Sequence, residues 1–230
     1  MNLTRRFFAV SAALLLVAPV GVAAQKKPAV DWTKTVVATS EGGFRMGNPK
    51  APVKLVEYGS LTCPHCKHFA ESGMTPLKAY VRTGKVSFEY RNYVLNGIDL
   101  AATLVARCGG AARFFPAIDK FYATQNQWVA KISGMPDAEK EKIRALAEGP
   151  RLDRLATIGG MKALAAPLGI TPAQSTKCLS DPAGLKRVLG MVEAGQAFGV
   201  QGTPTFFVNG SRVNAGDWPS LEPHIKSAGG

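Results

Sequence analysis

The sequence predicts an α/β fold that contains an inserted block of α-helices. Two observations predict it. Strand-type and helix-type patterns alternate over residues 35–93, and a strand pattern returns at 205–213 after about 100 residues (98–198) with helical patterning. The chain has 230 residues, which is enough to bury a sizeable core. Hydrophobic residues make up 46% and charged residues 19%, and this composition excludes a disordered chain.

The net charge of +12 does not by itself indicate a nucleic-acid partner. The basic residues are scattered singly or in pairs along the chain instead of forming blocks. Proteins that bind nucleic acid usually cluster their lysines and arginines on one face or along one helix. We therefore expect no nucleic-acid partner.

Residues 1–24 are typical of a cleavable secretory signal peptide. Arg5 and Arg6 precede a short, mostly apolar run that ends in two alanines. The apolar run is too short and too interrupted for a retained membrane anchor. The segment 4–8 also partly resembles a twin-arginine export motif, so both export routes stay open. We therefore expect the chain to be exported from the cytoplasm into a compartment where thiols can be oxidised.

The first strands lie before residue 60. Residues 35–39 form a short candidate strand, and the glycines and proline within 42–49 predict a loop. The next strand is predicted at 53–58, where side chains alternate between the two faces. This alternation places Glu57 on the more apolar face.

A helix is predicted from Cys63 to about Val81, with Gly73 and Pro76 as points where it kinks or splits. A strand follows at 86–93.

The rest of the chain divides into the long helical stretch and a return to strands. Asn-Gly at 209–210 joins two short strand patterns, 205–208 and 211–213, as in a hairpin. A closing helix is predicted at about 220–228, with Pro223 in its first turn. We accordingly assign residues 25–97 and 199–230 to one sheet-containing domain, and residues 98–198 to an inserted helical subdomain.

The segment Cys63-Pro64-His65-Cys66 follows the 53–58 strand and opens a helix. The first N–H groups of a helix lack partners and its dipole favours negative charge, so the pKa of Cys63 should be lowered. Pro64 suits the first turn because the N–H it lacks is not needed there. His65 would add a favourable interaction through a protonated or donating ring.

The two-residue spacing lets Cys63 and Cys66 close and reopen as a disulfide. We expect Cys63 to be the attacking sulfur and Cys66 the resolving sulfur. A stabilised thiolate stabilises the reduced form, which makes the closed disulfide a better oxidant. The sequence therefore favours donation of disulfides.

The Cys63-Pro64-His65-Cys66 motif, followed by Thr203-Pro204 downstream, resembles the DsbA-type thiol-disulfide oxidoreductases of the thioredoxin superfamily. The resemblance covers nearly all of the chain after the signal and implies a thioredoxin fold with an inserted α-helical subdomain. It also implies a cis peptide bond before Pro204 in a loop that lies against the cysteines. The backbone of Thr203 would then be free to pair with an extended substrate chain.

Glu57 stands where the superfamily often carries a buried acid beneath the motif. Such an acid can relay a proton to or from Cys66 as the disulfide opens. A carboxylate at a strand end that reaches solvent is the alternative. Both interpretations stay open from the sequence alone.

Cys108 and Cys178 stand singly in the helical stretch. In an exported protein we expect them to form a structural disulfide between two helices, worth about 2–4 kcal/mol. Buried free thiols are the alternative.

The resemblance implies a dithiol oxidase that donates disulfides to reduced secreted proteins in the periplasm. It implies reoxidation by a quinone-linked membrane partner of the DsbB kind, with no bound cofactor, and we expect a monomer.

Two alternatives remain for this function. The first is an isomerase or reductase. The family's isomerases usually add an N-terminal dimerisation domain, and the roughly 25 residues between the predicted signal peptide and the 53–58 strand are too few to match one. The second is a copper-binding or holdase protein, since two thiolates with His65 or His68 nearby could hold Cu(I). A structural zinc site is disfavoured, because the sequence has no second ligand pair.

Overall fold

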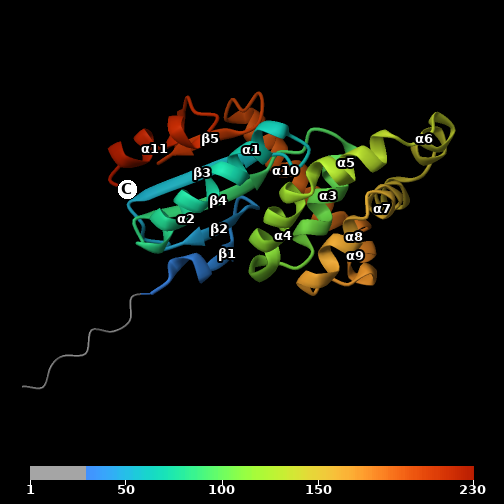
Figure 1. Ribbon diagram of the computed structural model, residues 1–230, viewed down its shortest axis with the longest axis horizontal. Helices are drawn as coiled ribbons and strands as arrows, with labels where there is room; N and C mark the ends of the chain where they lie inside the picture. The colour runs from blue at the N-terminus through green and yellow to red at the C-terminus, as the bar shows by residue number, and fades with distance from the viewer. Residues whose placement is uncertain (1–29) are drawn as a thin grey trace, which may run out of the picture.

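The computed structural model describes residues 30–230, so the predicted signal peptide lies outside the described residues. Figure 1 shows a sheet flanked by helices, with most of the remaining helices gathered beside one end of it. The strand order is β1-β2-β4-β3-β5-β6. Strands β3 and β4 are parallel, and every other neighbouring pair is antiparallel. The predicted α/β class is confirmed.

The strands follow the expected order, with one addition. They are β1 (Val36–Ala38), β2 (Phe44–Gly47), β3 (Val53–Gly59), β4 (Val86–Asn92), β5 (Thr205–Val208) and β6 (Ser211–Val213). The prediction of a loop across 42–49 is wrong, because β2 pairs with both β1 and β4. Phe44 and Met46 are buried on this strand, and tertiary packing outweighs the local glycine signals.

Residues 97–197 are helical almost throughout, as predicted. The α-helices of the chain are α1 (Pro64–Ser72), α2 (Met74–Arg82), α3 (Gly97–Arg107), α4 (Ala111–Ala123), α5 (Gln125–Ser133), α6 (Asp137–Arg144), α7 (Glu148–Ile158), α8 (Met161–Ala165), α9 (Pro172–Leu179), α10 (Pro182–Ala197) and α11 (Trp218–Ser227). No helix in this described part is long and apolar enough to cross a membrane.

Two helix boundaries correct or refine the sequence predictions. The expected split of the motif helix falls at Gly73, between α1 and α2. Helix α11 begins at Trp218 because Asp217 caps it in a capping box with Ser220. Pro223 therefore lies in the second turn of α11 and not in the first.

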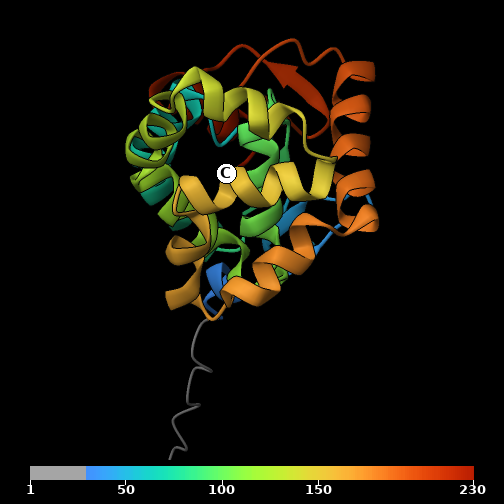
Figure 2. The same ribbon diagram turned by 90° about the vertical axis from the view of Figure 1, so that its right-hand side faces the viewer.

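The two faces of the sheet are covered by different helices. Strand β3 buries Val53, Leu55 and Glu57 on one face, as its alternation predicts. On that face α1 packs on β5, with the rings of Phe69 and Phe206 4.7 Å apart. On the opposite face α10 approaches Tyr58, and Figure 2 shows this long orange helix along the right edge of the molecule.

Helix α4 joins the helical block to the sheet. The ring of Phe114 stacks on that of Phe44 in β2 at 4.2 Å, and Phe115 lies 5.8 Å from Phe88 in β4. All four rings belong to one continuous hydrophobic core. The division into two domains at residues 97/98 and 198/199 stays a prediction.

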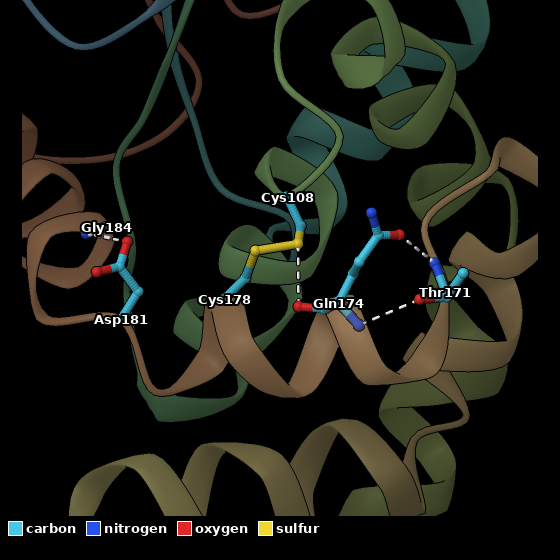
Figure 3. The surroundings of a disulfide bond; sticks show 6 residues. All are labelled: Cys108, Thr171, Gln174, Cys178, Asp181 and Gly184. Atoms are coloured by element: carbon cyan, nitrogen blue, oxygen red, sulfur yellow. Dashed lines mark hydrogen bonds between the residues drawn. A yellow bond between two sulfur atoms is a disulfide. The ribbon is translucent and has the colours of Figure 1, made fainter.

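The expected disulfide is present. Cys108 caps the end of α3 and Cys178 lies in α9, with an S–S distance of 2.04 Å and a Cα–Cα distance of 5.8 Å (Figure 3). The alternative of two free thiols at these positions is wrong.

We expect Phe114→Ala to lower the free energy of unfolding by about 3–5 kcal/mol, because it removes a fully buried ring between the helical block and the sheet. Phe198→Ala is the matched control. The Phe198 side chain is 64% exposed, so its removal should change the free energy of unfolding by no more than about 0.5 kcal/mol. Urea unfolding measures both. Equal losses for the two variants would show that α4 is not packed as described.

Candidate functional site

Cys63 lies at the boundary between a strand–helix loop and helix α1. Strand β3 ends at Gly59, Cys63 is the residue that caps α1, and Pro64 is its first helical residue. The predicted position of the motif at a helix start is therefore confirmed. The backbone N–H groups of His65 and Cys66 both lower the pKa of Cys63. Cys63 is 6% exposed, whereas Cys66 is fully buried.

The two sulfurs of the motif have opposite acidities. The pKa of Cys63 is lowered to about 5, chiefly because the Cys66 thiol donates a hydrogen bond to its sulfur, and burial only partly opposes this. The pKa of Cys66 is raised, mainly by burial and then by its hydrogen bond to Cys63. In the reduced protein one sulfur is therefore held as a thiolate and the other as a thiol.

Thr203 faces Cys63 from the loop before β5. The Thr203–Pro204 peptide bond is cis, as the resemblance implies. In the thiol form, Cys63 Sγ donates to the carbonyl oxygen of Thr203 at 3.1 Å. The Thr203 hydroxyl is buried and has no hydrogen-bond partner among residues 30–230. It is placed to donate to the thiolate, and such a bond lowers the pKa of Cys63.

The backbone and the ring of His65 have different surroundings. Its N–H supports the Cys63 thiolate, but its imidazole is exposed, as is that of His68. The expected contribution of the His65 ring stays a prediction.

Glu57 is the buried acid beneath the motif. Its side chain is 2% exposed, which rules out a carboxylate that reaches solvent. Burial, and to a lesser degree the negative charge of Cys63, together raise the pKa of Glu57 from 4.5 to about 8. The Glu57 charge in turn raises the pKa of Cys66. The acid is therefore electrostatically coupled to the resolving sulfur and carries a proton near neutral pH.

A second buried acid, Asp99 at the start of α3, was missed by the sequence analysis. Its carboxylate accepts from Ser60 Oγ at 2.6 Å and from the N–H groups of Leu61 and Leu95, each at 3.0 Å. Burial raises its pKa to about 6, against the lowering effect of these hydrogen bonds. An acid in the first turn of a helix is an ordinary capping pattern, so the sequence carried no signal that Asp99 reaches the loop before Cys63.

Helices α4 and α5 also hold the loop before Cys63. Gln125 Nε2 donates to the carbonyl oxygens of Leu61 at 2.8 Å and Cys63 at 3.0 Å. The Tyr122 hydroxyl donates to the backbone carbonyl oxygen of Ser60 at 3.0 Å. The buried polar groups of this loop thus find partners on three helices of the inserted block. The helical block fixes the position of the reactive sulfur.

This arrangement is suited to thiol–disulfide exchange: a stabilised thiolate and a neighbouring thiol lie at one helix start, with a buried, protonated acid beneath them. Within residues 30–230, no three His, Cys, Asp or Glu side chains gather as metal ligands would.

Comparison with known proteins agrees with this chemistry. The thioredoxin family model matches residues 39–227. Two proteins named as protein-disulfide oxidoreductases are similar. The one of Rickettsia conorii is 29% identical, and the match covers 81% of this chain and 60% of the relative. The one of Rickettsia bellii is 30% identical, and the match covers 89% of this chain and 71% of the relative. This chain therefore spans only part of these relatives. The crystal structure of a protein-disulfide isomerase from Novosphingobium aromaticivorans superposes with a TM-score of 0.74 and 32% identity, covering 80% of this chain and 95% of that one.

We expect the ultraviolet absorbance of the Cys63 thiolate in the reduced protein to titrate with a midpoint near pH 5. Thr203→Val keeps the side-chain shape but removes the hydroxyl donor, so it should raise this midpoint by about one unit. Cys63→Ala should remove the transition. A wild-type midpoint near 9, the ordinary value of a cysteine, would contradict the geometry.

Glu57→Gln should stabilise the reduced protein at alkaline pH. The pKa of Glu57 is raised from 4.5 to about 8 on folding, so the folded state loses stability as pH rises through this range. Glutamine mimics the neutral acid and avoids this loss. The free energy of unfolding of the variant should match that of the wild type near pH 4.5 and exceed it above pH 8. A difference that does not vary with pH would show that Glu57 is not titrating as described.

Proposed function

The chain belongs to the thioredoxin family, and from that premise we propose that it is a thiol-disulfide oxidoreductase that donates disulfides to reduced proteins through Cys63 and Cys66. The observation that carries the proposal is the opposite acidity of the two sulfurs: the pKa of Cys63 is lowered to about 5 and that of Cys66 is raised. A dithiol held in this way stabilises the reduced form relative to the disulfide, so the disulfide is a strong oxidant.

The first step opens the Cys63–Cys66 disulfide of the oxidised protein. A substrate thiolate attacks Cys63 Sγ, a substrate–Cys63 bond forms, and the Cys63–Cys66 bond breaks with its electron pair on Cys66. Cys66 then takes up a proton, because its pKa in the buried site is high. Protonated Glu57, with a pKa of about 8, is the proposed donor of that proton.

The second step releases the substrate. A second substrate thiolate attacks the substrate sulfur of the mixed disulfide, and Cys63 leaves as a thiolate. Its low pKa makes it a good leaving group, and the hydroxyl of Thr203 stabilises the released anion. The substrate loses two electrons and gains a disulfide, while the protein ends as Cys63 thiolate and Cys66 thiol.

The cellular setting belongs to the same proposal. The signal-like residues 1–24 support export to the periplasm, where substrates would be newly secreted proteins. The DsbA-type resemblance supports reoxidation by a quinone-linked membrane partner of the DsbB kind. It also supports action as a monomer.

Disulfide isomerisation is the second candidate, favoured by the likeness to the Novosphingobium structure described as a protein-disulfide isomerase. Two substrates separate the activities: a reduced unfolded protein, which needs an oxidant, and a scrambled protein, which needs its disulfides rearranged. We expect the oxidised chain to act on the first substrate much faster than the reduced chain acts on the second. The reverse order would favour the isomerase.

Cys66→Ala should keep the attacking sulfur of Cys63, with a higher pKa because the hydrogen bond from Cys66 is lost, but it lacks the resolving sulfur. When it is mixed with an unfolded, disulfide-containing protein, it should accumulate a covalent mixed disulfide on Cys63, visible on a non-reducing gel. Cys63→Ala should form no such adduct, because the remaining sulfur is fully buried and its pKa is raised. The double variant Cys108→Ser/Cys178→Ser is the control and should keep exchange activity. Equal adduct formation by Cys63→Ala and Cys66→Ala would overturn the assignment of Cys63.

A further inference from the structure

A cavity of about 300 Å³ lies apart from the cysteine motif, where the end of α3 meets the starts of α4 and α10 beside β1 and β2. None of its lining residues belongs to the redox site. They are Ala38, Phe44, Leu104, Arg107, Cys108, Gly110, Ala111, Cys178, Asp181, Gly184 and Arg187. Its volume is at the lower end of the range for small-molecule sites.

Arg107 is a largely buried cation without a carboxylate partner. Its guanidinium lies 4.7 Å from the centre of the Phe44 ring and donates to Asn92 Oδ1 at 2.8 Å and to the carbonyl oxygen of Gly42 at 2.6 Å. These are neutral acceptors, and none of the ion pairs within residues 30–230 includes Arg107. The charge of a guanidinium that is removed from water is usually paired with an anion. Because Arg107 uses two of its five N–H donors in these hydrogen bonds, three remain for another group.

A second arginine lines the same cavity. Arg187 projects from α10, is exposed, and likewise takes part in no ion pair among the described residues. Burial, and to a lesser degree the charge of Arg187, together lower the pKa of Arg107 to about 10. The two cations therefore repel each other across a space in which an anion would relieve the repulsion.

The cavity's own acid does not neutralise both arginines. Asp181 is the only acidic side chain among the described lining residues, and its two oxygens accept from the N–H groups of Ala183 and Gly184, each at 3.0 Å. Figure 3 shows Asp181 turned toward Gly184 at the start of α10. Helix α4 begins at Ala111 on the cavity wall without a side-chain cap, which adds partial positive charge there.

The disulfide holds the walls of this cavity together. Cys108 directly follows Arg107, and Cys178 comes three residues before Asp181. The Cys108–Cys178 bond thus ties the end of α3 to the segment that leads into α10. A cavity built in this way is preorganised, which lowers the entropy cost of binding a ligand.

We propose that this cavity binds a small organic anion with at least two negative charges, of the phosphate or carboxylate type, held between Arg107 and Arg187. Two guanidinium groups provide fork-shaped donors that match the oxygens of either group. This inference is independent of the redox function, because no residue of the cysteine motif takes part in it.

Isothermal titration calorimetry of the oxidised protein in low-salt buffer tests the proposal with two probes, inorganic phosphate and citrate. At least one probe should bind saturably with one site per chain, and the tighter probe identifies the oxyanion class. Arg187→Gln should weaken binding at least tenfold. Lys186→Gln is the matched control, because it removes an exposed cation next to Arg187 that does not line the cavity. It should change the affinity less than twofold.

Three results would overturn the proposal. The first is no saturable binding of either probe. The second is equal weakening by Arg187→Gln and Lys186→Gln, which would indicate attraction to the general positive charge of the protein. The third is full affinity in Arg187→Gln. Thermal unfolding without anion checks that both variants are folded, and we expect their midpoints to agree because both side chains are exposed.

Discussion

The hydrogen bond from the Cys66 thiol to the sulfur of Cys63 is the interaction on which the redox chemistry of this protein depends. It is the largest cause of the low pKa of Cys63, and the two residues can meet because Cys63 caps α1 and Cys66 lies in its first turn. The N–H groups of that turn and the hydroxyl of Thr203 add to it. Burial alone would act in the opposite direction, so the thiolate persists because hydrogen bonds outweigh desolvation.

The inserted helices act as a support for this sulfur. The loop between β3 and α1 has buried polar groups, and these are satisfied by Asp99 from α3, Tyr122 from α4 and Gln125 from α5. Because the same helices share one core with the sheet, the position of the loop is tied to the packing of the whole molecule. Precise placement of a reactive group requires support of this kind from neighbouring side chains.

The sequence predicts those parts of the fold and site that depend on neighbours along the chain. The helix start at Cys63 follows from Pro64 and the preceding strand, and the burial of the Glu57 face follows from alternation in β3. Strand β2 was missed because Phe44 is held by Phe114, 70 residues away, against local turn signals. Asp99 and Gln125 were missed for a similar reason, since they meet the loop across 38 to 64 residues of sequence. Thr203 was anticipated only through family resemblance.

The central claim is that hydrogen bonding to the Cys63 anion makes the Cys63–Cys66 disulfide strongly oxidising. Equilibration with glutathione buffers of defined ratio, followed by quantification of the dithiol form, measures this directly. We expect the dithiol to predominate at a potential of about −180 mV, where the disulfide of a weak oxidant would persist. A disulfide that stays closed down to about −270 mV, as in a reductase of the thioredoxin kind, would contradict the account.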